Sequence, residues 1–337
     1  MGKQKLSEGV AWLATWLSGM LPFSEVSEVL GQVGGIEISA STVWREVQER
    51  GERIREAEAP SQVEAVELEE ESLAGAKEEK VAKRMGSSMD GGMIYIKGEG
   101  WKEAKLGVIF EVGLEKRVDE RSQEWVEVGH AVNNSYVAHL GGPEMLGALL
   151  WKEARRRRWE KAAESVVLGD GAAWIWNLVS THFYDSKQIV DWYHGVAHLS
   201  AAAELLYEQD PQGARRWSEQ WKGRLYQGEA AQLAEHLKRA AACEGAAQSK
   251  KAEALQVEAG YFLANQRRMQ YMQMREDGWP IGSGMVESGC KQFKHRFAGP
   301  GMRWSRAGAE RLIPIRTAIM SKRFDAIWNR TFNSPPI

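Results

Sequence analysis

The order of predicted strands and helices in the middle of the chain limits the fold more than any other feature. Three segments with strand-like composition, separated by short turns, lie at 93–98, 105–112 and 125–132. A helical pattern follows at 143–164, and two short apolar strands in the next thirty or so residues alternate with further helices. Three strands followed by alternating helices and strands predict an α/β domain.

Helical segments flank this domain on both sides. Residues 6–51 have apolar positions at helical spacing around a Gly-Gly break, and Ser39 or Ser41 can cap the second helix. Helix, glycine-containing turn and helix is the shape of a helix-turn-helix, and a plain helical hairpin gives the same pattern. Residues 65–84 are charged, as in a linker, and residues 200–275 are helical throughout.

These patterns divide the chain into five predicted parts. The element order of the central part is that of an RNase H-like α/β core. The parts are a helical, helix-turn-helix-like region at 1–55, a charged linker at 56–85, the first part of the core at 86–200, an all-helical insertion at 201–278, and the completion of the core with basic helices at 279–337.

Charge is unevenly distributed along the chain. The formal net charge is only −2, yet ten Lys and Arg residues stand against two acids between Ser288 and Arg330. A locally basic end predicts a partner with phosphates, although a solvated helix face gives the same pattern. The two cysteines exclude a disulfide framework and a Cys-rich zinc site. Without a signal-like or membrane-spanning segment, we expect a cytoplasmic protein with no membrane partner.

Three carboxylates are flanked by glycine at the ends of predicted elements. Asp90 lies at the start of the first strand, Asp170 in a Gly-Asp-Gly turn after the fourth, and Glu287 at the start of a helix after Gly-Ser-Gly. Flanking glycines remove side chains and allow a metal ion or a phosphate backbone to approach closely. Acids at strand ends of an α/β domain converge on one crevice, where shared divalent ions drive two-metal phosphoryl transfer.

Each acid also has a purely structural interpretation. Asp-Gly is common in turns, and an acid in the first turn of a helix favours the helix dipole. The combined placement of the three acids favours a site for two Mg²⁺ or Mn²⁺ ions. His194 and His198 have the spacing of zinc ligands, but they lack the intervening Glu of a metalloprotease and do not favour a zinc site.

Six stretches, in the same order along the chain, resemble bacterial insertion-sequence transposases of the DDE type, in the Kra family and its Mutator-like relatives. One of them is WPIGSGMVESGCKQFKHR at 279–296. The others begin DGGMIYIKG at 90, LGDGAAWIW at 168, IVDWYHGVAHL at 189, YFLANQRRMQY at 261 and GMRWSRAGAE at 301. Together these stretches cover the chain from about 85 to 330.

The resemblance implies that Asp90, Asp170 and Glu287 are the catalytic, metal-binding triad. It also implies that Asp191 and His194 form an accessory acid-x-x-His element beside the active site. Such an enzyme cleaves the terminal inverted repeats of its element and joins them to target DNA. We therefore expect DNA as the partner and a homo-oligomer when DNA is bound.

Eight basic residues are expected to neutralise DNA phosphates, which predicts salt-dependent binding. They are Lys291, Lys294, Arg296 and Arg303 near the Glu287 helix, and Arg155, Arg156, Arg157 and Arg158 in one run. Two other functions stay open: a DNA-binding protein derived from a transposase, without strand transfer, and a metal-dependent nuclease. The first is suggested because family members usually begin with a Cys-rich segment, and this sequence has no cysteine before Cys243.

Overall fold

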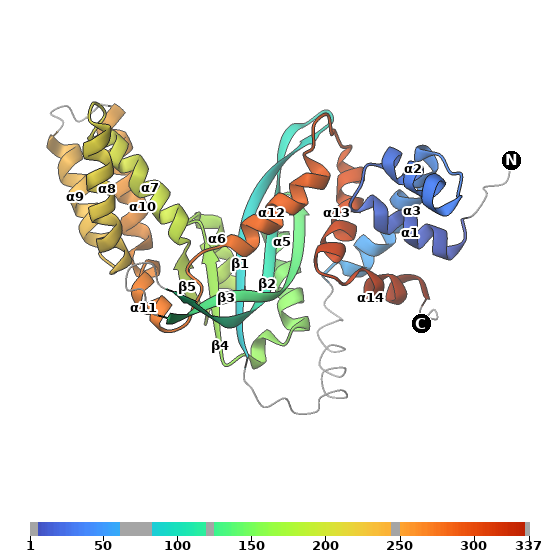
Figure 1. The fold of residues 1–337 in the computed structure, drawn as a ribbon, viewed down its shortest axis with the longest axis horizontal. Helices are drawn as coiled ribbons and strands as arrows, with labels where there is room; N and C mark the ends of the chain where they lie inside the picture. The colour runs from blue at the N-terminus through green and yellow to red at the C-terminus, as the bar shows by residue number, and fades with distance from the viewer. Residues whose placement is uncertain (1–5, 61–82, 119–124, 244–249, 334–337) are drawn as a thin grey trace.

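A five-stranded mixed sheet in the order β3-β2-β1-β4-β5 lies at the centre of the protein (Figure 1). The computed structural model describes residues 6–60, 83–118, 125–243 and 250–333. The strands are β1 (Arg84–Ile96), β2 (Gly100–Val118), β3 (Trp125–Leu140), β4 (Glu164–Gly169) and β5 (Lys187–Val190). The first three pair antiparallel, whereas β4 pairs parallel with both β1 and β5. The predicted α/β class is confirmed.

The first strand is longer than its sequence suggests. It begins at Arg84, so Asp90 lies inside β1. The prediction that Asp90 lies at the start of this strand was wrong. The segment before Asp90 is rich in Ser and Gly and does not resemble a core strand, yet Ser87 and Ser88 are fully buried. A Cβ atom on Gly86 would lie 2.1 Å from the ring of Phe110. Small side chains are needed here because neighbouring groups pack directly onto the backbone.

Helices α12 (Gly284–Phe297) and α5 (Pro143–Arg156) cover opposite faces of this sheet. A Cβ atom on Gly289 of α12 would touch the side chains of Leu106 and Tyr136. A Cβ atom on Gly107 would instead touch Leu150 of α5. Because successive residues of a strand point to opposite faces, these contacts assign one face to each helix. Helix α6 (Ala173–His182) packs beside α5.

Helix α5 ends at Arg156, although the sequence pattern predicts a helix that continues to residue 164. Arg158 has a φ of 60°, in the left-handed region, which stops the helix. A short 3₁₀ turn, η1 (Trp159–Lys161), follows. It buries Trp159 against the ring of Phe183, with ring centres 4.9 Å apart.

A bundle of helices projects from the β5 side of the sheet (Figure 1). Its members are α7 (Trp192–Leu206), α8 (Pro211–Tyr226), α9 (Ala230–Cys243) and α10 (Lys250–Asn265). The short η2 (Gln266–Arg268) and α11 (Tyr271–Glu276) lead back towards α12. These helices fall within the segment predicted to be a helical insertion, except that α7 begins earlier, directly after β5. None of the described helices is long and apolar enough to cross a membrane.

The first helices of the chain pack against the last ones (Figure 1). Helices α1 (Glu8–Ser18), α2 (Phe23–Gly34) and α3 (Ala40–Glu58) lie beside α13 (Arg306–Met320), α14 (Phe324–Trp328) and the π-helical turn η3 (Asn329–Asn333). As predicted, Ser39 caps α3, because its Oγ accepts a hydrogen bond from the Thr42 backbone N–H at 3.2 Å. Most of the predicted linker, residues 61–82, lies outside the described residues.

Two buried arginines join α1 to the core. Arg296 of α12 donates from Nε to the Ser18 carbonyl at 2.7 Å, and Arg316 of α13 donates from Nη1 to the Gly19 carbonyl at 3.3 Å. The free carbonyls at a helix C-terminus attract cations. Arg296 is only 2% exposed, and burial lowers its pKa to about 10. Arg296 was predicted to bind DNA, but it lies inside the protein and holds α1 in place.

The predicted DNA-binding run 155–158 lies at the end of α5, on the face of the sheet opposite α12. Arg156 donates from Nε to Glu153 at 2.9 Å. Arg157 donates from Nη1 to the Ile109 carbonyl at 2.7 Å and from Nη2 to Glu111 at 3.1 Å. Arg156 and Arg157 therefore bind the protein itself. Both were predicted to bind DNA phosphates.

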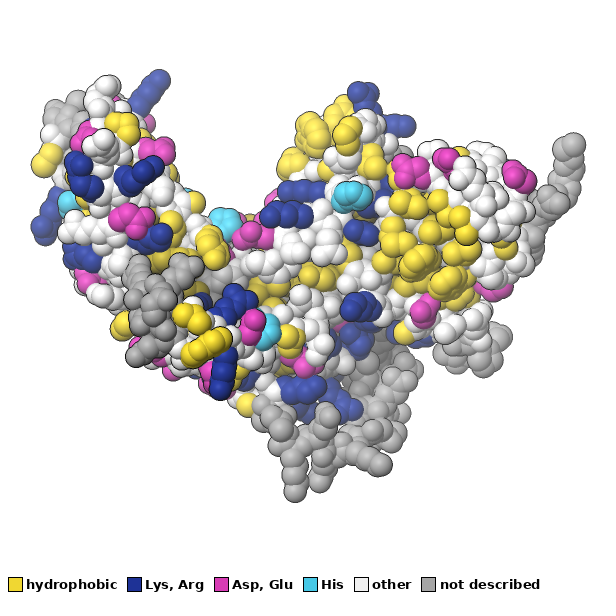
Figure 2. Space-filling model, viewed as in Figure 1, with side chains coloured by type: hydrophobic (Ala, Val, Ile, Leu, Met, Phe, Trp, Pro, Cys, Tyr) yellow, Lys and Arg dark blue, Asp and Glu magenta, His cyan; other side chains and the backbone are white. Residues whose placement is uncertain are grey.

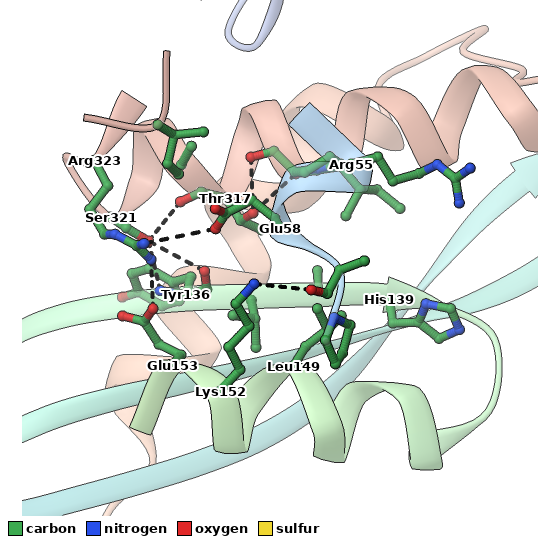
Figure 3. A pocket seen from close by; sticks show the side chains of 18 of the residues that line it. Arg55, Glu58, Tyr136, His139, Leu149, Lys152, Glu153, Thr317, Ser321 and Arg323 are labelled. Atoms are coloured by element: carbon green, nitrogen blue, oxygen red, sulfur yellow. Dashed lines mark hydrogen bonds and ion pairs between the residues drawn. The ribbon is translucent and has the colours of Figure 1, made fainter. Parts of the chain in front are cut away.

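Glu153 lines a cavity of about 860 Å³ between α3, α5, β3, α13 and α14 (Figure 3). The charged side chains there are engaged with one another: Arg323 donates to Glu153 at 2.5 Å, and Arg330 forms an ion pair with Glu58. The cavity contains none of the predicted catalytic residues. The buried Arg323–Glu153 pair joins α5 to the C-terminal helices, and the partly exposed Arg330–Glu58 pair joins them to α3.

We expect Glu153→Gln to lower the free energy of unfolding at pH 7 by about 3 kcal/mol, because it leaves Arg156 and Arg323 without their buried acid. Burial alone would raise the pKa of Glu153, but the two arginines hold it below its ordinary value of 4.5. The stabilisation is therefore complete above pH 4.5 and is lost as the pH falls through the folded-state pKa. The free energies of unfolding of the wild type and of Glu153→Gln should therefore converge as the pH falls. Urea unfolding of the two proteins between pH 7 and pH 3.5 measures this. A difference that does not depend on pH would contradict it.

Candidate metal centre

The pairing of β1 with β4 places two of the predicted acids side by side. Ser88 pairs with Leu168 at the end of their parallel register. Two residues beyond this last pair, the chain reaches Asp90 within β1 and Asp170 directly after β4, so the two acids follow the same pair of strands. Paired residues of neighbouring strands point to the same face. Asp90 also pairs with Leu106 of β2, whose side chain contacts α12, so both acids belong to the α12 face of the sheet.

The pairing of β4 with β5 adds a third acid to this row. Gly169 pairs with Val190, so that Asp170 stands opposite Asp191 one residue further on. The Asp191 backbone N–H donates to the Gly169 carbonyl at 2.7 Å, which extends the pairing to Asp191 itself. Asp90 lies within β1, whereas Asp170 and Asp191 directly follow β4 and β5. The three acids thus lie on neighbouring strands of the sheet, and the last two mark the carboxyl edge of β4 and β5. This edge is where ligands bind in α/β sheets.

Helix α12 carries Glu287, Cys290 and Lys294 along β1 in successive turns. Burial, followed by the charge of Asp90 and a hydrogen bond with it, raises the pKa of the Cys290 thiol. The Glu287 charge also acts on this thiol. A Cβ atom on Gly92 would lie 2.5 Å from Cε of Lys294. The helix thus brings Glu287 to the same face as the row of aspartates and lays Lys294 across β1.

Asp191 connects the start of α7 to the start of α12. Its side chain is fully buried, and its Oδ1 accepts from the His194 backbone N–H at 2.8 Å. Its Oδ2 accepts from the Ser283 backbone N–H. Burial alone would raise the pKa of Asp191, but these hydrogen bonds hold the pKa below its ordinary value. The carboxylate is therefore ionised and fixes two helix starts at once.

His194 lies between the acids. Its Nδ1 is 3.1 Å from Asp191 Oδ1, and because an ionised carboxylate only accepts, Nδ1 carries the proton. The hydrogen bond to Asp191 raises the pKa of His194 despite partial burial, and the charges of Asp170 and Glu287 act in the same direction. The two catalytic candidates Asp170 and Glu287 thus both lie close enough to this ring to influence its charge.

Asp191, His194 and Glu287 together could hold a metal ion, since their ligand atoms all lie within 4.8 Å of one another. Asp191 already accepts hydrogen bonds on both oxygens, which suits a residue that orients a histidine better than one that binds the ion directly. The carboxylates of Asp90, Asp170 and Glu287 offer only oxygen, the ligand atom that Mg²⁺ and Mn²⁺ prefer. Glu287 belongs to both sets. It is further held by Ser283, whose Oγ donates to Glu287 Oε1 at 3.2 Å.

His198 does not join His194 in a zinc site. Its Nδ1 lies 2.8 Å from Glu258 Oε2, and its ring stacks on Tyr261 with ring centres 3.6 Å apart. His198 therefore belongs to the contact between α7 and α10.

Tyr261 is a site residue for which the sequence analysis predicts no role. Its hydroxyl donates to the Asp170 backbone carbonyl at 2.8 Å, so α10 holds the turn that carries this acid. Gly171 has a φ of 104°, and a Cβ atom there would lie 2.6 Å from the Tyr261 ring. Glycine is required beside Asp170 on both counts. Lys294 fills the space beside Gly92, and Tyr261 fills the space beside Gly171. We had predicted that flanking glycines leave room for a metal ion or a phosphate backbone, and at these two glycines protein side chains take that room.

The other predicted basic residues near Glu287 are exposed. Lys291 and Lys294 lie on the surface of α12, and Arg303 lies after it, with Cζ 5.5 Å from the Tyr95 ring centre. Figure 2 shows a hollow between the projecting helices and the β1–β2 hairpin. Acidic, histidine and Lys or Arg side chains gather on its floor, over α12.

Divalent ions should stabilise this protein, and removal of Glu287 should abolish the effect. At an Mn²⁺ concentration 100 times Kd, we expect the free energy of unfolding to rise by about 2.7 kcal/mol. Glu287→Gln should remove most of this gain, because Glu287 belongs to both ligand sets. Asp90→Asn weakens binding if the carboxylates hold the ion, and His194→Ala weakens it if the histidine set does. Thermal unfolding with titrated Mn²⁺ measures the gain in stability. Glu235→Gln, which removes an exposed carboxylate on α9, is the control and should keep the full gain. Unchanged binding by the Glu287 variant would rule out both sets.

Neither models of protein families nor curated proteins match this chain when their sequences are compared with it. The candidate centre therefore rests on its own geometry. One aspartate within β1, two that directly follow β4 and β5, the helix that carries Glu287, and a histidine oriented by a buried carboxylate form a set of residues suited to binding a divalent cation.

Proposed function

We propose that this protein is a metal-dependent DNA transposase that cleaves and joins DNA through Asp90, Asp170 and Glu287 on an RNase H-like core. The observation that carries the proposal is that the paired parallel strands β1 and β4 lead to Asp90 and Asp170, each two residues beyond their last pair, while α12 carries Glu287 along β1. A structural role for each acid alone gives no reason for this convergence. The strand order β3-β2-β1-β4-β5 also supports the proposed core.

The three carboxylates would hold Mg²⁺ or Mn²⁺. Two such ions, when bound, neutralise the attacking and leaving oxygens of an in-line displacement at phosphorus. The protein contributes a fixed arrangement: Tyr261 holds the Asp170 turn, Ser283 holds Glu287, and Asp191 orients His194. Such an arrangement is useful because acids that are held in place need not reorganise during the reaction.

The hollow in Figure 2 supports DNA as the substrate. Lys291 and Lys294 lie exposed on α12 beside Glu287, and no ion pair engages them among the residues that the structure describes. Such cations are available to phosphates, and phosphate contacts fix the position of a nucleic acid relative to the catalytic groups. The scissile phosphate would lie over the row of aspartates, with the backbone along α12.

The N-terminal helices would recognise the ends of the element. Helices α2 and α3 and the short turn between them have the outline of a helix-turn-helix, in which the start of the second helix contacts base edges. Trp44 and Arg45, near the start of α3, are exposed. The reaction joins paired ends, so we propose a DNA-bound homo-oligomer that acts in the cytoplasm.

Purified full-length protein should convert labelled element ends and supercoiled target DNA into joined products in the presence of Mg²⁺ or Mn²⁺. Asp170→Asn should reduce the rate at least a hundredfold, because an amide binds divalent ions far more weakly than a carboxylate. Gel analysis of the products gives both the activity and the pathway. Lys238→Ala, far out on α9, is a matched surface control and should keep full activity.

The same assay separates the other candidate functions. Nicked or cut DNA without joined products indicates a nuclease. A shift in mobility without cleavage indicates a transposase-derived DNA-binding protein. Full activity of the Asp170→Asn variant would overturn the proposed triad.

DNA binding should weaken with salt, and the α12 lysines should account for part of this dependence. We expect Lys294→Ala to reduce the slope of log K against log salt concentration by about one, because each phosphate contact releases about one counterion. Fluorescence anisotropy between 50 and 300 mM salt measures the slope. Lys238→Ala, whose lysine pairs with Glu235 at 2.9 Å, should leave the slope unchanged. Equal slopes for wild type and Lys294→Ala would place the DNA elsewhere.

A further inference from the structure

The free end of the β1–β2 hairpin carries a cluster of exposed apolar side chains. Trp101 is 60% exposed and Met93 is 47% exposed. Tyr95 packs edge-on against Trp101, with ring centres 5.6 Å apart and an interplanar angle of 87°. Exposed apolar side chains that occur singly are ordinary, whereas a cluster such as this one indicates a contact surface.

Positive charge surrounds this cluster. Arg303 lies beside the Tyr95 ring, and Lys97 is exposed at the hairpin turn. No ion pair engages either cation within the described part of the chain. The acids nearby are already engaged, since Glu99 accepts from Arg306 at 2.8 Å and Glu103 pairs with Lys105. Aromatic side chains among free cations favour nucleic acid, whose bases stack while its phosphates bind the cations.

The hairpin leads directly from the candidate centre to this cluster. Asp90 and Tyr95 lie on the same strand, and at about 3.3 Å per residue they are roughly 17 Å apart. Lys294 crosses the strand between them, at Gly92. Figure 2 shows hydrophobic side chains over the end of the hairpin, with Lys or Arg side chains next to them.

The two ends of this path lie on different faces of the hairpin. Asp90 is on the α12 face, and Tyr95, five residues further along β1, is on the other face together with Trp101, its cross-strand partner on β2. A nucleic acid that reaches from one to the other must turn around the edge of β1 between Ser88, where pairing with β4 ends, and Tyr95, whose carbonyl accepts from the Trp304 backbone N–H. Duplex DNA is stiff over this length, with a persistence length of about 150 base pairs. A single strand bends easily.

We propose that the end of the β1–β2 hairpin binds unpaired DNA, with a base stacked on Trp101 and phosphates held by Arg303 and Lys97. The proposal rests on the function proposed above and adds a substrate feature to it, namely a single-stranded segment close to the reacting phosphate. A base loses its stacking partner when the indole is removed, which weakens binding about tenfold.

The test measures the affinity of the full-length protein for a labelled 20-nucleotide single strand and for the matching duplex, by fluorescence anisotropy without divalent ions. We expect Trp101→Ala to bind the single strand about tenfold more weakly and the duplex as tightly as wild type. Trp101→Phe keeps an aromatic face and should recover most of the affinity. Tyr184→Ala removes an aromatic side chain that is 78% exposed elsewhere, and it should change neither affinity.

Each other outcome overturns a defined part of the proposal. Unchanged single-strand affinity of Trp101→Ala, or equal losses on both DNAs, overturns the stacking site while leaving the proposed function intact. Failure of the wild type to bind either DNA counts against the proposed function itself. A Trp101→Ala effect confined to self-association in sedimentation would make this surface a contact between copies and overturn the DNA assignment.

Discussion

The parallel register between β1 and β4 is the constraint on which the rest of the structure depends. It joins the antiparallel strands β1–β3 to the parallel strands β4 and β5, and its last pair, Ser88 with Leu168, lies two residues before Asp90 and Asp170. A slip of one residue would turn every side chain of one strand to the other face and separate the two acids. The buried serines and the glycine before Asp90 suit a strand with a fixed register, because their small side chains let neighbouring groups pack directly onto the strand.

The candidate centre is assembled from elements that are distant in sequence, and buried polar groups hold it together. Asp191 fixes the starts of α7 and α12, while Tyr261 on α10 fixes the turn of Asp170. The projecting helices are therefore part of the support of the centre and not an independent attachment to the sheet. A carboxylate that satisfies several backbone N–H groups is costly to disturb, because each group left unpaired in the interior keeps its desolvation penalty.

The sequence predicts the acids of this centre better than their surroundings. Asp170 follows a clear apolar strand and Glu287 begins a clear helix, so their positions could be predicted, and Asp191 and His194 followed from the family resemblance. The true start of β1 could not be predicted, because Ser and Gly become core residues only when a neighbouring strand covers them. Lys294 and Arg296 show a second limit: they are two residues apart on one helix, yet one is exposed and the other is 2% exposed. Which face of a helix is buried depends on what packs there, and Arg296 is covered by a helix from the opposite end of the chain.

The packing of α1–α3 against α13 and α14 also has a consequence for how the protein is made. About 250 residues separate α3 from α13, and at ribosomal rates of about 5–20 residues per second this interval lasts roughly ten to fifty seconds. The first helices leave the ribosome long before their packing partners exist. Until α12 and α13 emerge, the carbonyls at the end of α1 lack the two arginines that they bind in the finished protein. Glu287 lies on that same late segment. The segment that completes the candidate centre thus also completes the attachment of the N-terminal helices, so a nascent chain gains both together.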